Sequence, residues 1–332
     1  TLFTPDFIAA VLVTAAGLAA YRPLFGMLHV PAPAMEDACG YMKIICYGTV
    51  FVFGYNAVCS ILKGVGDSKS PLYFVAVATV INIVLDLLLV GPFGMGTEGA
   101  ACATIFSQGI SFVISVFHLK RTDFVFDFQL SHFAVKTDKL AAILKIGLPT
   151  AAQMVVVNLS YLLITGMLNQ FGVSVAAASG VGLKINTFAG MPCWAIGQAV
   201  TAMAGQNIGA GDTIRVRKTT STGLCLNLFI TLVMVLLVQI FGKQLILLFT
   251  PASPEVLAEG IVYLRICCGV NSLVYAAMYT FDSFAIGTGA ATIALFNALL
   301  DAVIVRLPVS WLLAFPLGLG YPGIYIGQAI SP

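Results

Sequence analysis

The chain has 332 residues, of which 59% are hydrophobic and only 9% are charged, with a net charge of +2 and a mean hydropathy of +0.99. Soluble domains carry about 25% charged residues, so this composition excludes a soluble globular protein, a disordered chain and a basic protein that binds nucleic acid. Apolar residues recur along the whole length, which also excludes a single membrane anchor. The sequence therefore predicts an all-α, polytopic membrane protein.

Ten apolar segments follow one another along the chain, and a helix that crosses a bilayer needs about 20 mostly apolar residues. The predicted spans are 7–28, 41–62, 71–92, 97–119, 142–168, 175–203, 219–241, 257–284 and 291–314, with a tenth that begins after 320. Lys and Arg gather in alternate connections, which by the positive-inside rule face the cytoplasm. We therefore expect a multi-pass protein of the cell membrane whose segment around Thr1 starts on the cytoplasmic side. The longest polar connection, 120–141, is expected to link a first helix bundle, 1–119, to a second, 142–332.

An internal repeat supports this division. Three short motifs, at 41–46, 64–66 and 94–99, recur at 263–268, 287–289 and 318–323, with offsets of 222 to 224 residues. The repeat predicts two pseudo-symmetric six-helix bundles, twelve spans in the intact protein, of which this chain holds about nine and a half. Two such halves in the same orientation are typical of transporters whose substrate cavity lies between the halves.

The cysteines and histidines show no pattern of a redox or metal centre. The eight cysteines include no CxxC pair and the three histidines lack HExxH spacing, so packing thiols are the favoured interpretation. No Walker A sequence is present, so ATP does not drive the chain directly. We expect no enzyme activity, no cofactor and no metal beyond a possible coupling Na⁺.

Several motifs resemble those of the multidrug and toxic compound extrusion (MATE) transporters. The end of that family's eighth helix is similar to Gly205-Gln206-Asn207-Ile-Gly209-Ala-Gly211-Asp212, and its fourth-to-fifth helix connection is similar to Lys63-Gly64-Val-Gly66-Asp67. Its fifth helix is similar to the segment with Asn82-x-x-x-Asp86, and the start of its seventh helix is similar to Gly147-Leu-Pro149. The resemblance implies a fragment from about helix three to the start of helix twelve. It also implies cation-driven export of amphipathic, often cationic drugs by alternating access.

Asp86 is the first candidate for a coupling residue, because ionisable residues inside a membrane span are costly and functional by default. Asn82 and Asp86 are four residues apart and so lie on one helix face. The resemblance adds Thr104 on the next helix, where similar transporters place a hydroxyl beside this pair. A carboxylate, an amide oxygen and a hydroxyl suit Na⁺, and a buried carboxylate equally suits a proton carrier, so both coupling ions stay open. The alternative is polar packing between helices.

Three further ionisable residues within the predicted spans are considered as candidates. Asp282 is a candidate for gating or for contact with a cationic substrate. Asp301 repeats the Asn-x-x-x-Asp spacing with Asn297, but at an offset of 215, so it is not the repeat counterpart of Asp86. Lys184 is expected to pair with an interior acid or carbonyl. One branch of the similar transporters has a Glu partway along the seventh helix, whereas the equivalent stretch here, Val155-Val-Val157-Asn158, contains no acid. This difference favours coupling through the first half.

The glycine-rich stretch that contains Gly205, Gln206, Asn207, Gly209 and Gly211 has two interpretations. Glycines let a helix end and a neighbour approach closely, and this structural role is favoured over direct substrate contact. For the whole protein the leading hypothesis is a monomeric exporter that binds small amphipathic molecules within the bilayer. The alternative is a flippase for lipid-linked precursors or polysaccharide, which would require an Arg-rich cavity.

Overall fold

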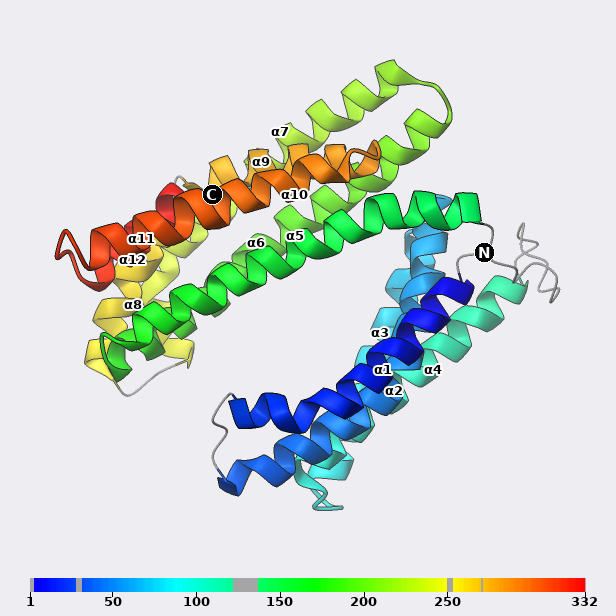
Figure 1. Cartoon of the computed structure of the whole chain (residues 1–332), viewed down its shortest axis with the longest axis horizontal. Helices are drawn as coiled ribbons and strands as arrows, with labels where there is room; N and C mark the ends of the chain where they lie inside the picture. The colour runs from blue at the N-terminus through cyan, green and yellow to red at the C-terminus, as the bar shows by residue number, and fades with distance from the viewer. Residues whose placement is uncertain (1–2, 28–31, 122–136, 250–252, 270, 332) are drawn as a thin grey trace. The chain divides into compact units, whose positions relative to one another are not determined.

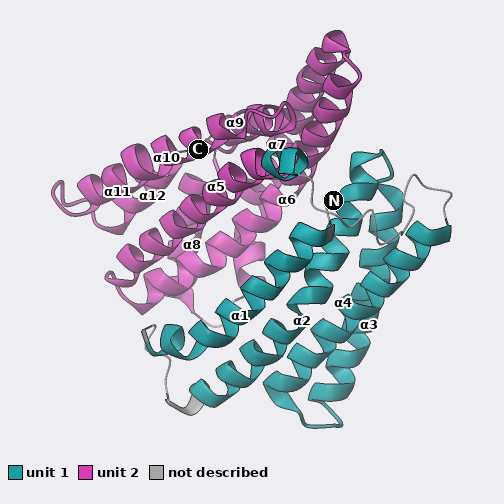
Figure 2. Cartoon of the chain, turned by 45° about the vertical axis from the view of Figure 1, so that its right-hand side comes forward, with its two compact units in different colours: residues 1–142 teal, residues 143–332 magenta. Residues whose placement is uncertain are grey.

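The computed structural model describes residues 3–27, 32–121, 137–249, 253–269 and 271–331. Helices make up nearly all of the described chain, which contains no strand (Figure 1). The chain divides into two compact units, residues 1–142 and 143–332 (Figure 2). The fold class is therefore all-α, as the composition predicts.

The first unit contains four long helices. They are α1 (Phe3–Met27), α2 (Ala32–Gly64), α3 (Lys69–Val90) and α4 (Gly96–Arg121). Helix α2 packs against α1 and α4, and α3 packs against α4. Glycines allow the close contact between α2 and α4, because a Cβ atom at Gly48 would overlap the Ile105 side chain and one at Gly54 would lie only 2.6 Å from Phe112. Small residues commonly bring membrane helices together in this way.

The second unit contains the remaining helices. They are α5 (Thr137–Asn169), which begins just before the division, α6 (Val173–Gly209), α7 (Thr213–Phe249), α8 (Pro254–Cys267), α9 (Asn271–Gly287), α10 (Ala291–Leu299), the π turn η2 (Leu300–Arg306), α11 (Leu307–Ala314) and α12 (Tyr321–Ile330). Helix α6 packs against α7, α8 and α9, while α12 packs against α11 and α8.

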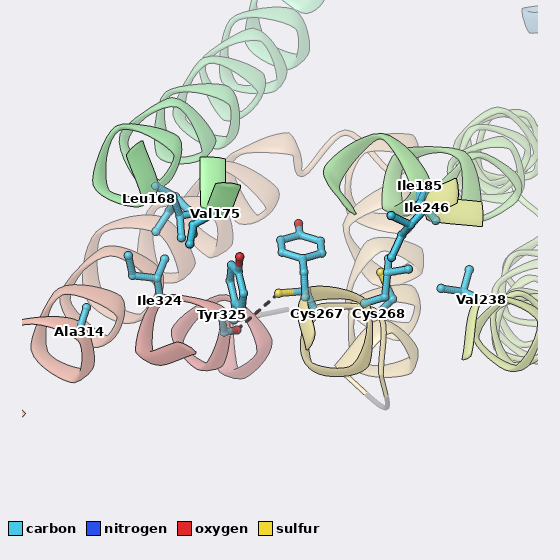
Figure 3. Close-up of a cluster of buried hydrophobic side chains, with 13 residues drawn as sticks. Leu168, Val175, Ile185, Val238, Ile246, Cys267, Cys268, Ala314, Ile324 and Tyr325 are labelled. Atoms are coloured by element: carbon cyan, nitrogen blue, oxygen red, sulfur yellow. Dashed lines mark hydrogen bonds between the residues drawn. The ribbon is translucent and has the colours of Figure 1, made fainter. Parts of the chain in front are cut away.

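An aromatic and aliphatic cluster forms the core of this unit (Figure 3). The rings of Tyr263 on α8 and Tyr325 on α12 meet edge to face, with centroids 5.0 Å apart. Cys267 donates from its thiol to the backbone oxygen of Tyr325 at 3.6 Å, and Leu168 brings the end of α5 into the same cluster. All eight cysteines are free thiols and six of them are buried, as expected of packing residues.

Seven described helices are long and apolar enough to cross a membrane, or eight if the bent pair α8–α9 is one span. The protein is therefore a multi-pass membrane protein, although the count is lower than the ten predicted segments. The predicted span 175–203 lies within α6, which is long but carries polar side chains along its length and is not among the seven. The tenth predicted segment begins with α12, which has ten residues in this chain.

Two predicted spans are not continuous α-helices. The segment 257–284 is broken between α8 and α9, whose axes differ by 51°. The Asn271 side chain accepts from the Gly269 N–H at 3.2 Å and donates to the Cys267 carbonyl at 3.3 Å, so local side-chain bonds replace the helical ones. The segment 291–314 contains the π turn η2.

The internal repeat is visible in the backbone. Gly94 and Gly96 have φ angles of 61° and 55°, and their counterparts Gly318 and Gly320 have 68° and 65°. The Met95 N–H bonds to the Leu89 carbonyl at 2.9 Å, and the Leu319 N–H bonds to the Leu313 carbonyl at 3.1 Å. The same turn is therefore built twice, once in each unit.

Candidate functional site

A small polar cavity lies within the first unit, among residues of α2, α3 and α4. Its volume is about 120 Å³ and its lining consists of Tyr55, Val75, Ala78, Thr79, Asn82, Thr104, Ser107 and Gln108. The structure thus brings together Asn82 and Thr104, two of the three residues predicted to form a coupling site. Asp86 lies one helical turn beyond Asn82 on α3 and is not part of this lining.

Polar atoms around this cavity lack partners among the described residues. The amide nitrogen of Asn82, the Oδ1 atom of Asp86 and the Oε1 atom of Gln108 are buried and make no hydrogen bond there. The Thr104 hydroxyl donates to the Ala100 carbonyl at 3.0 Å, so its oxygen can still accept. Buried polar groups are nearly always paired, so unsatisfied ones beside a cavity fit a place where an ion, a proton or water binds.

The first unit also contains a larger cavity of about 340 Å³, and residues of α1 and α2 line it. Asp6, Asn56 and Ser60 give it a carboxylate, an amide and a hydroxyl, while Phe53 and Val52 give it apolar surface. Sequence patterns did not single out Asp6. The signal that could have found it is an acid in the first turn of an otherwise apolar helix.

In the second unit, Asp282 on α9 is held by two amides. Gln153 on α5 donates to its Oδ2 atom at 3.3 Å, and Asn297 on α10 donates to its Oδ1 atom at 3.1 Å. The Asp282 residue is only 6% exposed, and no cation forms an ion pair with it in the described chain. The carboxylate is thus solvated by neutral donors, an arrangement that holds its orientation without compensating its charge.

Asp301 is in a different electrostatic situation, because Arg306 lies beside it. The Arg306 Nη2 atom is 2.8 Å from the Asp301 Oδ2 atom, and both residues are buried. Asn297, whose spacing suggested a pair with Asp301, donates instead to Asp282. Sequence patterns missed Arg306; an acid and a base five residues apart in an apolar segment, followed by Pro308, would have been the signal.

Lys184 does not have the interior partner that was expected. The residue is exposed on α6, and no ion pair joins it to any residue that the structure describes. Helix α6 instead places polar groups other than Lys184 in the interior of the unit, such as Thr201, whose hydroxyl donates to the Ser283 carbonyl at 2.9 Å.

The glycine-rich stretch 205–211 forms the end of α6. The Asp212 N–H bonds to the Asn207 carbonyl at 2.9 Å, and Gly211 has a φ of 75°. Both features are typical of a helix that ends at a glycine. A Cβ atom at Gly205 would lie 3.2 Å from the Gly287 carbonyl oxygen, so α6 and α9 approach closely there. The Asn207 amide donates to the Thr219 hydroxyl at 3.1 Å, which ties the helix end to α7. These contacts are those of a helix terminus and a close helix crossing.

Comparison with known families adds to this geometry. A protein-family model described as MatE matches residues 6–88 and 149–312, well over half of the chain. The chain is 33% identical over 323 residues to the probable multidrug resistance protein YpnP of Bacillus subtilis, covering 96% of the chain and 70% of the relative. It is 31% identical over 256 residues to the probable multidrug resistance protein YoeA of the same organism, covering 75% of the chain and 55% of the relative. The chain thus spans between about half and 70% of the lengths of these relatives.

Solved structures agree on the fold. One is described as the outward-facing conformation of a multidrug resistance MATE family transporter of the MOP superfamily. It matches with a TM-score of 0.93 at 22% identity, covering 99% of this chain and 74% of that one. A transporter of the same superfamily from Pyrococcus furiosus matches with a TM-score of 0.94 at 21% identity, covering 99% and 74%.

Proposed function

Because the chain belongs to the MATE family of membrane transporters, we propose that the complete protein is a secondary active multidrug exporter. It exchanges a cation, Na⁺ or H⁺, for amphipathic and often cationic compounds, by alternating access at the cell membrane. We expect it to act as a monomer, and expect no cofactor beyond the coupling ion. The relatives named as multidrug resistance proteins support the class of cargo.

The observation that carries the proposal is the Oδ1 atom of Asp86, which is buried and has no hydrogen-bond partner among the described residues of the first unit. A charged side chain in a membrane interior costs several kcal/mol unless it is compensated, and such residues mark ion pathways. The buried Oδ1 atom of Asp86 has no partner in the described chain, one turn from Asn82 and its cavity with Thr104. A bound Na⁺ or a proton would supply the missing compensation in either coupling scheme.

Asp282 is proposed as the contact for a cationic substrate or as a gating residue in the second unit. Its two neutral amide donors leave a net negative charge that a cation can neutralise. Asp301 is less suited to this role, because Arg306 already neutralises it. The scarcity of basic residues facing either described cavity argues against the flippase alternative, whose pyrophosphate cargo would need Arg or Lys there.

The test is ethidium efflux from cells that express the full-length protein, comparing wild type with the Asp86→Asn variant. We expect efflux in wild type and its loss in the variant, with equal amounts of protein in the membrane. Collapsing the sodium gradient and the proton gradient in turn identifies the coupling ion. The matched control is Asp138→Asn, which removes the same charge from an exposed carboxylate in the first turn of α5.

Two results would contradict parts of the proposal. Gradient-driven efflux at the wild-type rate in Asp86→Asn would reduce the Asn82 and Asp86 pair to helix packing. An absence of efflux in wild type, across several cationic dyes, would instead contradict the multidrug exporter and favour the flippase.

A further inference from the structure

The Arg306 guanidinium makes an ion pair, two hydrogen bonds and a ring contact within the second unit. Its Nη2 atom pairs with Asp301, its Nε atom donates to the Ser331 hydroxyl at 3.0 Å and its Nη1 atom donates to the Ser160 hydroxyl at 3.0 Å. The Ser331 hydroxyl in turn donates to Asp301. The guanidinium also lies over the Tyr161 ring, 4.7 Å from its centroid. Arg306 is 4% exposed and Asp301 9%, so the whole arrangement is removed from the surface of the unit.

The π turn makes the ion pair possible. In an α-helix only residues three or four apart lie above one another, whereas a π turn bonds residue i to i+5 and so aligns residues five apart. The Leu307 N–H bonds to the Ala302 carbonyl in this wider pattern. Pro308 follows directly and lacks the N–H that a continuing α-helix would need. The backbone thus places Asp301 and Arg306 on one face, toward α5 and α12.

Few side chains of helix α5 are buried within the second unit. Its buried residues are Ser160, Ile164 and Leu168, and no described side chain of α5 before Ser160 is buried. Ile164 and Leu168 belong to the apolar core cluster, so they anchor the end of the helix. Upstream of Ser160 the described polar contact to the rest of the unit is the bond from Gln153 to Asp282, at 3.3 Å.

We propose that Arg306 is a positioning residue that latches α5 onto the second unit, and that α5 swings about Ile164 and Leu168 when the latch opens. A buried ion pair rarely adds stability over apolar side chains of similar size. The presence of one in this apolar segment therefore favours a role in fixing the position of α5 relative to the rest of the unit. Ser160 and Tyr161 form the α5 side of the latch, while Asp301 and Ser331 hold the guanidinium in place. The proposal rests on the proposed function only in assigning the released state to the transport cycle.

The test measures the position of α5 directly. Spin labels are placed on the full-length protein at two exposed positions, Val155 on α5 and Leu312 on α11, after replacing Cys225 and Cys102, the cysteines that are not buried. Double electron–electron resonance then gives the distribution of label distances. We expect Tyr161→Leu and Ser160→Ala each to add a population displaced by about 2 Å or more, the scale of helix shifts in switching proteins.

The chain offers a matched control at the same position. Tyr161→Phe keeps the ring under the guanidinium and removes only the hydroxyl, so its distance distribution should match wild type. If Tyr161→Leu and Ser160→Ala leave the distribution unchanged, or if Tyr161→Phe displaces it as far as Tyr161→Leu does, the latch is wrong. A lowered melting temperature with unchanged distances would likewise reduce Arg306 to a structural role.

The label distances do not depend on transport, so the two proposals can fail separately. A shift of the distances in a protein that exports no dye would retain the latch and contradict the exporter. If both latch variants export dye at the wild-type rate and keep the wild-type distance distribution, the exporter is retained and the latch is contradicted.

Discussion

At the scale of single residues, Asp67 shows how a carboxylate outside the spans stabilises the fold. Its Oδ1 atom accepts from the backbone N–H groups of Lys69 and Ser70, at 3.1 and 3.0 Å, and its Oδ2 atom accepts from the Ser70 hydroxyl at 2.6 Å. The hydroxyl of Ser70 also lies 3.1 Å from the His118 ring at the end of α4. Asp67 therefore caps α3 and connects the start of that helix to α4.

We expect Asp67→Ala to lower the free energy of unfolding at pH 7 by about 1 kcal/mol, the usual value of a helix cap. The hydrogen bonds from Ser70 hold the pKa of Asp67 below its ordinary value. A carboxyl group with a lowered pKa in the folded state stabilises above its unfolded pKa, near 3.9, and that contribution disappears as the pH falls through the folded value. Melting curves of both proteins should therefore differ by the same amount at pH 7 and 5, and the difference should shrink progressively as the pH falls below about 4. A difference that grows as the pH falls below about 4 would contradict the electrostatic part of this explanation.

At the scale of elements, the break between α8 and α9 is stabilised from a third helix. Gln239 on α7 donates to the Leu264 carbonyl at 2.9 Å, which also accepts from the Cys268 N–H at 3.0 Å. It donates as well to the Cys268 carbonyl at 2.8 Å, whose helical partner, the Ser272 N–H, bonds instead to the Gly269 carbonyl at 3.1 Å. Gln239→Leu has a similar size and should lower the free energy of unfolding by about 1–3 kcal/mol, the cost of leaving the Cys268 carbonyl unsatisfied. Hydrogen exchange should rise selectively in residues 264–269. Gln170→Leu, at the exposed end of α5, is the control, and equal effects of the two substitutions would argue against a specific role of Gln239.

Sequence patterns predict the elements better than they predict the contacts between them. Apolar length and the positions of Lys and Arg suffice to locate the long helices, because a helix in a bilayer satisfies its own backbone. The break near Gly269 escaped prediction because it depends on bonds from Asn271 and Gln239, which no apolar pattern records. Likewise, the spacing of Asn297 suggests Asp301, but packing against α9 gives it Asp282.

At the scale of the whole molecule, the repeat gives each unit the same glycine turn. The effect of one substitution can therefore be compared at two equivalent positions. Gly94 and Gly318 both have positive φ, and no atom lies within 4 Å of a Cβ built on either. Alanine at these positions would therefore be strained by the backbone alone, at about 1–2 kcal/mol each. We expect Gly94→Ala and Gly318→Ala to lower the melting temperature by equal amounts, while Gly26→Ala, inside α1 and equally uncrowded, leaves it unchanged or raises it slightly. Markedly unequal losses would mean that the two turns share a shape but not an energetic role.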